Sequence, residues 1–247
     1  MITELEFKSL ASEGYNRIPL MVEAFADLET PLSLYLKLAH TKDGGKHSFL
    51  LESVVGGERF GRYSFIGLPA RTLLRATGPR TEVVTDGQVV EVHEGNPLDF
   101  IAEYQARFKP ALPPGLPRFC GGLAGYFGYD TVRFIEKKLA HTTKPGGIGT
   151  PDLLLLQTEE LAVIDNLSGR LYLIVWADPS RPEAFFNAKR RLADLTDKLR
   201  YSVTAPAVKR GPSYAVEREF AKADFEAAVQ KAKDYIAAGD CMQIVIG

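Results

Sequence analysis

The chain has 247 residues, of which 45% are hydrophobic, and its formal net charge is −1 from 30 basic and 31 acidic residues. That length and apolar content can bury the core of one large domain or two small ones. A net charge so close to zero gives no electrostatic reason to expect nucleic acid or an anionic membrane as a partner.

The two cysteines, Cys120 and Cys241, belong to no CxxC pair and have no histidine pair nearby that would complete a zinc site. A disulfide between them stays open, although a reduced cytoplasmic protein is the simpler interpretation. The first nine residues mix charged with apolar side chains, and no run approaches the ~20 apolar residues of a membrane span. The sequence therefore predicts a cytoplasmic protein without a membrane partner.

A helix followed by two strands is expected in the first third of the chain. Thr30 and Pro31 suit the N-cap and the first helical position, and this helix is expected to end near Lys42. Apolar runs at 48–55 and 62–67 predict a hairpin or a short crossover, because the connection between them is rich in glycine and charge.

Glu52 and Ser53 are unusual in the first of these strands, because their neighbours are apolar. A carboxylate and a hydroxyl among residues that face a core need partners. One interpretation is a structural ion pair of Glu52 with Arg59 or Arg62. The other is a small pocket for a zwitterion.

The letters LLES, followed after two residues by GGERFGRYSFIG, resemble the N-terminal signature of the anthranilate synthase component I family. In that family the serine of LLES contacts the feedback inhibitor L-tryptophan. Carried over by position, the resemblance implies an effector site made of Ser53, Glu52 and Arg62, with Leu50 as part of its apolar wall.

Strand and helix signals continue through the middle of the chain. A strand is expected at 72–77, and Asp86-Gly87 between two β-branched runs is a strong hairpin signal, because both central residues of a type I′ turn need positive φ. Asn96 and Pro97 open a helix that is expected to run to Phe108.

Glycine and aromatic residues alternate in the run FCGGLAGYFGYD at 119–130. The run contains neither a P-loop nor a dinucleotide-binding motif. Glycines in a strand instead predict the close approach of a neighbouring backbone. The run also resembles the family's GG-x-x-GY-x-x-YD segment, which extends the resemblance beyond the first signature.

Three further strands are expected at 153–156, 160–164 and 170–176. Ser180 and Glu183 then predict a capping box for the following helix. Its apolar stripe predicts core packing, and the cluster Lys189-Arg190-Arg191 predicts a solvated face. The stripe consists of Phe185, Ala188, Leu192, Leu195 and Leu199.

A linker is predicted at 201–214, where the periodic pattern fades into proline and glycine. Beyond it we expect a helix that ends at Gly239, followed by a strand at 241–246. The letters AAGDCMQIV in this region resemble the opening of the family's chorismate-binding domain. The sequence therefore predicts one domain at 1–212 and the beginning of a second at 213–247.

Hairpin signals dominate and no repeating βαβ series appears, so the predicted fold is α/β of the α+β type, built on antiparallel sheets. In the family that the chain resembles, two such sheets pack as a sandwich with flanking helices.

The resemblance implies the N-terminal part of a lyase that converts chorismate and ammonia to anthranilate and pyruvate in tryptophan biosynthesis. It also implies Mg²⁺ as cofactor, a glutamine amidotransferase subunit as partner and feedback inhibition by L-tryptophan. In that family the catalytic residues and the Mg²⁺ ligands lie beyond the position of Gly247. We therefore expect no catalytic or metal residue in this chain, and no activity from the chain alone.

The residues themselves agree with that expectation, since the four histidines form no HExxH motif and no carboxylate pair is placed for acid–base work. Two alternatives stay open. One is aminodeoxychorismate synthase component I of folate synthesis, and the other is an amino-acid-binding module without catalysis.

Overall fold

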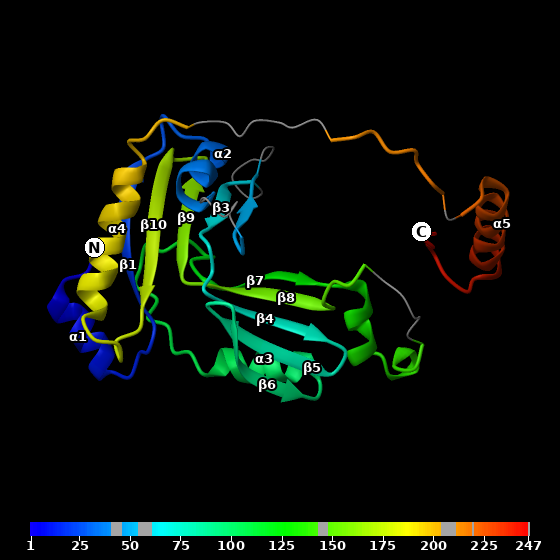
Figure 1. The fold of residues 1–247 in the computed structure, drawn as a ribbon, viewed down its shortest axis with the longest axis horizontal. Helices are drawn as coiled ribbons and strands as arrows, with labels where there is room; N and C mark the ends of the chain where they lie inside the picture. Colours follow the sequence, from blue (N-terminus) through cyan, green and yellow to red (C-terminus); the bar gives the residue numbers. More distant parts are fainter. Residues whose placement is uncertain (41–45, 54–60, 143–147, 204–210, 219, 247) are drawn as a thin grey trace. The chain divides into compact units, whose positions relative to one another are not determined.

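The computed structural model describes the chain except for residues 41–45, 54–60, 143–147, 204–210, 219 and 247. The backbone divides into two compact units, Met1–Ala205 and Pro206–Gly247. The boundary between them falls inside the linker that the sequence predicts. The first unit contains two five-stranded sheets, which Figure 1 shows with helices beside them.

The first sheet has the strand order β1-β10-β9-β3-β2. Its strands are β1 (Ile18–Phe25), β2 (Phe49–Leu51), β3 (Tyr63–Gly67), β9 (Glu160–Asp165) and β10 (Arg170–Ala177). The second sheet has the order β6-β5-β4-β8-β7. Its strands are β4 (Thr72–Thr77), β5 (Arg80–Thr85), β6 (Gln88–Glu94), β7 (Gly122–Phe127) and β8 (Leu153–Thr158).

Every pair of neighbouring strands in both sheets is antiparallel. The α-helices are α1 (Glu4–Ser12), α2 (Pro31–Leu34), α3 (Pro97–Ala106), α4 (Ala184–Lys198) and α5 (Lys222–Ala238). A π-helical turn and two 3-10 turns complete the first unit at Tyr35–Ala39, Tyr129–Phe134 and Lys137–Leu139. The predicted fold class, antiparallel sheets with flanking helices, is confirmed.

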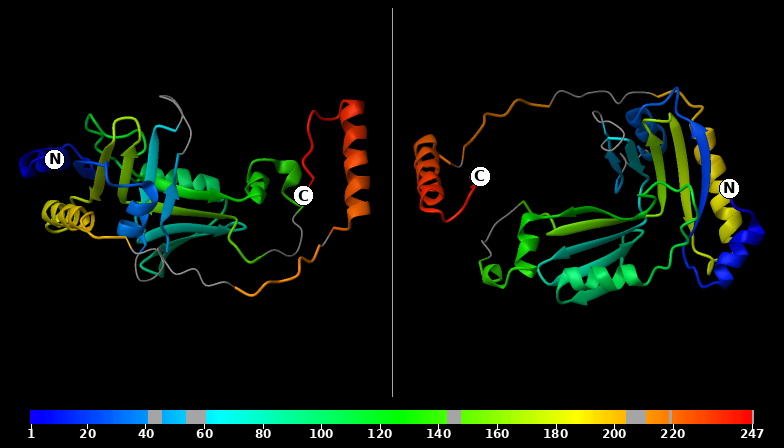
Figure 2. Two further views of the ribbon diagram at one scale, coloured as in Figure 1. Left: turned by 90° about the horizontal axis from the view of Figure 1, so that it is seen from above. Right: turned by 180° about the vertical axis from the view of Figure 1, so that it is seen from behind.

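Helices cover one face of each sheet. Figure 2 shows α1 and α4 on the same side of the first sheet in both of its views. There Leu34, Ile66, Leu173 and Leu192 join helices to strands in the largest cluster of buried side chains. Under the second sheet, Phe100 of α3 packs with buried leucines of β4 and β8. Burial of these apolar faces supplies the main driving force for the fold.

The opposite faces of the sheets carry smaller apolar clusters, because successive strand residues point to opposite sides. Leu161 and Val163 belong to the cluster on the first sheet, and Leu73 and Leu156 to that on the second. Phe49 packs against both clusters. It therefore ties the end of the first sheet to the second.

Phe49 lies opposite Gly67 in the pairing of β2 with β3, as the predicted hairpin requires. A Cβ atom on Gly67 would overlap the Phe49 ring, so the glycine makes room for the aromatic contact. The first strand is shorter than expected, because β2 ends at Leu51 and leaves Glu52 and Ser53 beyond the strand. The rest of the predicted connection lies outside the described residues.

Several local predictions are confirmed. Thr30 caps α2 by accepting a hydrogen bond from the Ser33 N–H, and Asp86 and Gly87 have the positive φ angles, 50° and 82°, of a hairpin turn. Asn96 caps α3, which ends at Ala106, two residues earlier than expected. The helix after Thr30 does not stay α-helical, because its last residues form the π-helical turn. Its predicted end at residue 42 is outside the described part of the chain.

The glycines of the aromatic run lie where another backbone approaches, as predicted. A Cβ on Gly125 would overlap the carbonyl oxygen of Leu154 and stand 2.9 Å from the Leu155 Cα. A Cβ on Gly128 would lie 2.7 Å from the carbonyl oxygen of Asp152. The run is therefore a tightly packed strand and its exit, which agrees with the absence of a phosphate-binding motif.

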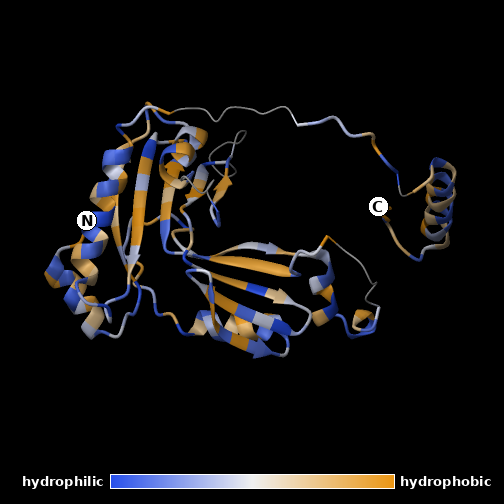
Figure 3. Cartoon of the chain, in the orientation of Figure 1, coloured by the Kyte–Doolittle hydropathy of each residue, from blue (hydrophilic) through white to orange (hydrophobic). Residues whose placement is uncertain are grey.

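The capping box predicted for α4 is wrong. Ser180 instead uses its N–H and its hydroxyl to bond the Asp178 carboxylate at 3.0 and 2.7 Å, and it lies before the helix, which begins only at Ala184. Glu183, with φ of 53°, is the N-cap and makes no side-chain cap bond. The predicted inward stripe is buried as far as Leu195, and Figure 3 shows hydrophobic and hydrophilic residues alternating along α4.

Arg191 also departs from the solvated face predicted for its cluster. Its Nε and Nη2 donate to the two carboxylate oxygens of Glu160 at 2.8 and 2.7 Å, and its side chain is only 33% exposed. Lys189 and Arg190 are exposed, as predicted. The difference arises because Glu160, at the start of β9, offers Arg191 a carboxylate partner on the sheet.

In the second unit α5 ends at Gly239, whose φ of 84° is that of the predicted glycine cap. The strand predicted at 241–246 is not formed. A strand needs a neighbour for its N–H and C=O groups, and the described residues of this unit provide none. No helix in the described part of the chain is long and apolar enough to cross a membrane. Both cysteines are free thiols.

Candidate effector site

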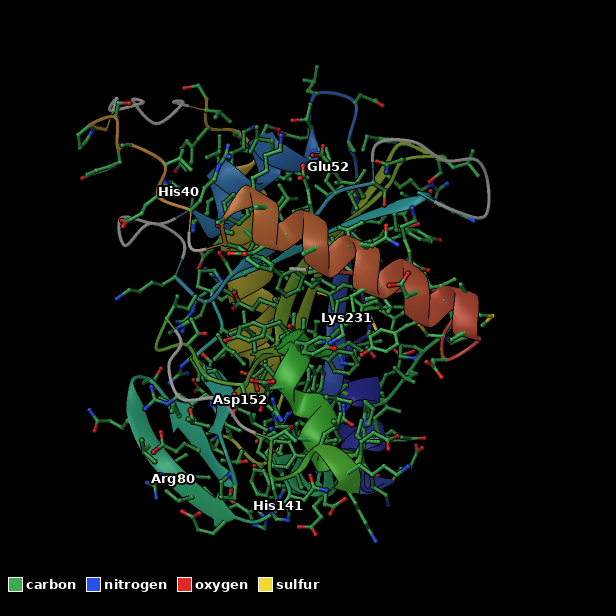
Figure 4. All side chains as sticks on the ribbon, turned by 90° about the vertical axis from the view of Figure 1, so that its right-hand side faces the viewer. His40, Glu52, Arg80, His141, Asp152 and Lys231 are labelled. Atoms are coloured by element: carbon green, nitrogen blue, oxygen red, sulfur yellow. The ribbon has the colours of Figure 1, made fainter. Side chains whose placement is uncertain are left out.

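The predicted effector residues lie at the end of β2 and the start of β3. Leu50 pairs with Ile66 and packs, half-buried, against the largest apolar cluster. Beyond the strand, Ser53 is half-buried and Glu52 is exposed. Glu52, labelled in Figure 4, makes no hydrogen bond or ion pair with any residue that the structure describes. Its carboxylate is therefore available to a ligand, as far as the described residues show.

Arg62 forms its ion pair with Asp165, so the structural pair of Glu52 with Arg62 is not formed; Arg59 lies outside the described residues. The Arg62 Nε and Nη2 atoms donate to Oδ1 and Oδ2 of Asp165 at 3.0 and 2.7 Å. This two-pronged geometry is the strong form of an arginine–carboxylate contact. It uses one edge of the guanidinium, and Nη1 has no partner among the described residues.

The Asp165 side chain is almost completely buried, at 1% exposure for the whole residue. The Arg62 guanidinium is the main reason why the pKa of Asp165 falls from 3.8 to about 2. The N–H groups of Leu167 and Ser168, which donate to Oδ1 at 3.1 and 3.4 Å, act in the same direction. Burial acts against them. The contact with Asp165 in turn raises the pKa of Arg62.

Replacing Asp165 by asparagine should lower the free energy of unfolding by about 2 kcal/mol at pH 7, with allowance for the partial exposure of Arg62. Because the folded pKa lies below the unfolded one, this stabilisation is present above about pH 4 and is lost as the pH falls toward 2. Urea unfolding of both proteins at pH 7, 4 and 3 should show the gap closing with acid.

The matched control is Asp86→Asn. Asp86 makes the same two-pronged contact with Arg71, but both side chains are more than half exposed, at 53% and 62%. An exposed pair contributes much less than a buried one because solvent screens it, and asparagine tolerates the positive φ of this position. Equal losses from the two substitutions would contradict the role assigned to Asp165.

Ser53 is held through its backbone. Its N–H donates to the hydroxyl of Ser64 at 3.2 Å, and Ser64 is fully buried in β3. The same hydroxyl oxygen accepts a hydrogen bond from the Asn166 amide nitrogen at 3.2 Å. The Ser53 hydroxyl itself has no partner among the described residues and can serve a ligand.

The sequence did not predict that Ser64, Asp165 and Asn166 contact the effector segment. The available signal was weak: Ser64 is a serine inside an apolar strand, and the two residues at 165–166 mark only a turn. The contact of Asp165 with Arg62 spans 103 positions along the chain, which no local pattern reports. Only the pairing of β3 with β9 brings them together.

Trp176 lines two pockets of about 440 Å³ each in the described part of the first unit. Neither is lined by any of the four predicted effector residues. The charges in the first pocket are largely matched, as in the contact of Arg191 with Glu160. The pockets therefore add nothing to the effector site.

No group of three or more histidine, cysteine, aspartate or glutamate side chains in the described residues could hold a metal ion. His40 and His141, labelled in Figure 4, lie far apart in the first unit. The described residues therefore offer no such cluster, and no step of the chemistry is assigned to them through Mg²⁺.

A family model described as chorismate binding enzyme matches residues 47–247. The chain is 52% identical over 248 aligned residues to a protein of Neisseria meningitidis serogroup C named anthranilate synthase component 1, an alignment that covers 99% of this chain and 50% of that protein. A protein of the same name from Pseudomonas aeruginosa is 47% identical, with 97% of this chain and 49% of that protein covered.

The chain thus spans about half the length of the curated relatives it matches. A crystal structure of anthranilate synthase component I from Streptococcus pneumoniae is 25% identical and superposes with a TM-score of 0.56, covering 88% of this chain and 46% of that one. Together with the family match over residues 47–247, these similarities establish that the chain belongs to the chorismate-binding enzyme family.

Proposed function

We propose that this chain is the N-terminal part of an anthranilate synthase component I, a lyase that converts chorismate and ammonia to anthranilate and pyruvate. The observation that carries the proposal is the 52% identity to a protein of that name over 99% of this chain. Identity at that level along the whole chain favours a shared activity over a shared fold alone.

The partner and the cofactor belong to the same proposal. A protein named component 1 has a second component, and we propose a glutamine amidotransferase subunit that supplies ammonia. Mg²⁺ is proposed as the cofactor, with ligands outside this chain. We also propose a cytoplasmic protein, which the two free thiols support.

We propose L-tryptophan as the feedback inhibitor, bound by the four residues at the end of β2 and the start of β3. The ligand presents an ammonium, a carboxylate and an indole ring, so its site needs an anion, hydrogen-bonding groups and an apolar wall. Glu52 offers a carboxylate for the ammonium, and Ser53 a hydroxyl; neither group has a partner among the described residues. Arg62 offers its Nη1 atom to the carboxylate of tryptophan, and Leu50 contributes to the apolar wall of the site.

The activity is tested by following anthranilate fluorescence with chorismate, ammonia and Mg²⁺. We expect turnover from the full-length polypeptide that the coding sequence specifies and none from the 247-residue chain, because the proposal places the catalytic residues and the Mg²⁺ ligands outside this chain. Turnover by the pure chain would overturn the assignment to the N-terminal part.

Product analysis separates the alternatives in the same experiment. Accumulation of aminodeoxychorismate in place of anthranilate by the full-length polypeptide would identify the related enzyme of folate synthesis. Absence of any product, with tryptophan still bound, would identify a binding module.

A further inference from the structure

The turn between β9 and β10, residues 165–169, supplies a second contact to the effector segment besides the ion pair of Asp165. The Asn166 side-chain nitrogen donates to the carbonyl oxygen of Gly61 at 3.2 Å and to the Ser64 hydroxyl at 3.2 Å. It also lies 3.5 Å from the Ser53 carbonyl oxygen, at the limit of a hydrogen bond. One amide therefore contacts both Gly61 and Ser53, which flank residues 54–60.

We propose that Asn166 is a positioning residue for the tryptophan site, an inference that rests on the effector function proposed above. Asn166 touches no proposed ligand-binding side chain directly. Its role is to hold the backbone of Ser53 near the start of β3, so that the Ser53 hydroxyl and the Arg62 guanidinium face the same ligand.

The need for such a contact follows from the strands. β2 has only three residues and lies at the edge of its sheet, so it orients the residues after Leu51 weakly. β9 and β10, by contrast, are paired over six residues and are buried in the main core through Ile164 and Leu171. The turn between them is therefore a firm support from which to position a short edge strand.

The 165–169 turn is itself anchored to the residue that precedes β3. The Asn166 N–H donates to the Arg62 carbonyl oxygen at 2.7 Å, and the Gly169 N–H closes the turn on the Asp165 carbonyl oxygen at 2.9 Å. The neighbouring Asp165 carboxylate holds the Arg62 side chain. Adjacent residues of one turn thus place two of the proposed ligand-binding residues: Asp165 holds Arg62, and Asn166 holds Ser53.

An amide suits this position, because its side-chain nitrogen donates to the oxygen acceptors around it. Aspartate has nearly the same shape, but its ionised carboxylate can only accept hydrogen bonds and cannot donate one. Its negative charge would also face the Gly61 carbonyl oxygen. Asn166→Asp therefore removes the donor with little change of volume. Asn166 is exposed, so neither this change nor Asn166→Ala disturbs the core.

The experiment titrates the full-length enzyme with L-tryptophan by calorimetry and measures uninhibited kcat and KM for chorismate. Both Asn166 variants should bind tryptophan about threefold to tenfold more weakly, a loss of about 0.7–1.4 kcal/mol at 1.4 kcal/mol per decade. Uninhibited kcat and KM should stay within about twofold, because the residue does not belong to the chemistry.

Asn16→Ala is the matched control. The Asn16 amide also joins distant segments, donating to the Arg107 carbonyl oxygen at 2.7 Å and accepting from the Lys109 N–H at 2.6 Å. Its loss should lower Tm without changing tryptophan affinity, which separates positioning from general stability.

Unchanged tryptophan affinity in the Asn166 variants, with weakened binding in Ser53→Ala, would overturn the positioning role and leave the effector site in place. Equal weakening in Asn16→Ala would overturn it as well, since a general loss of stability would then explain the effect. Wild-type enzyme that does not bind tryptophan would remove the effector site and this inference together.

Discussion

Ser53→Ala should weaken inhibition of the full-length enzyme by L-tryptophan about fivefold to a hundredfold, while uninhibited turnover stays nearly intact. Loss of one hydrogen bond from a buried ligand site costs roughly 1–3 kcal/mol, and 1.4 kcal/mol corresponds to a factor of ten in affinity. The structure supports the choice of this residue, because the Ser53 backbone N–H is bonded to Ser64 while its hydroxyl has no partner among the described residues.

Calorimetric titration of wild type and Ser53→Ala with tryptophan measures the effect directly, and anthranilate fluorescence measures turnover. Ser180→Ala is a matched control, because that exposed hydroxyl bonds Asp178 in a turn that shares no contact with Ser53. Unchanged tryptophan affinity in Ser53→Ala would contradict the assignment of Ser53 to the effector site.

Glu52→Gln distinguishes a ligand-binding role from a structural one at the neighbouring position. The described residues offer Glu52 no ion pair, and it is exposed, so neutralising it should leave Tm nearly unchanged and should weaken binding of the tryptophan ammonium. A fall in Tm with unchanged affinity would instead favour a structural partner for this carboxylate.

Gly125→Ala should destabilise the first unit by at least about 3 kcal/mol, a larger effect than most single substitutions have. The added Cβ would overlap the Leu154 carbonyl oxygen and stand 2.9 Å from the carbonyl carbon of the same residue. Overpacking against side chains costs about 1–3 kcal/mol, but backbone atoms in a paired strand cannot turn aside as a side chain can. Relief would require β7 to separate from β8.

Urea unfolding at 25 °C measures this loss, with Gly211→Ala as the control. Gly211 has no neighbouring atom within 4 Å of an added Cβ, so alanine there should change stability by less than about 0.5 kcal/mol. A loss below about 1 kcal/mol in Gly125→Ala would show that β7 is not held as close to β8 as the structure has it. Insoluble Gly125→Ala beside soluble Gly211→Ala would support the prediction.

Sequence by itself determined those features whose partners lie a few residues away. Thr30, Asn96 and Gly239 end or begin helices through bonds within one turn, and Asp86-Gly87 sets its hairpin through its own φ angles. The family was also readable from sequence, because its two signatures combine rare residues at fixed spacing. The effector roles of Leu50, Glu52, Ser53 and Arg62 stay predictions.

Tertiary structure alone decided which groups the polar residues contact. The sequence offered Glu52 as a partner for Arg62, but the pairing of β3 with β9 brought Asp165 to Arg62 from 103 positions away. Ser180 does not cap α4, because the helix begins only at Ala184 and the Ser180 side chain bonds the Asp178 carboxylate in the preceding turn. The physical reason is the same in both cases: a polar side chain bonds the best-placed partner once the chain has packed, and packing is set by buried apolar faces whose contacts are not local in sequence.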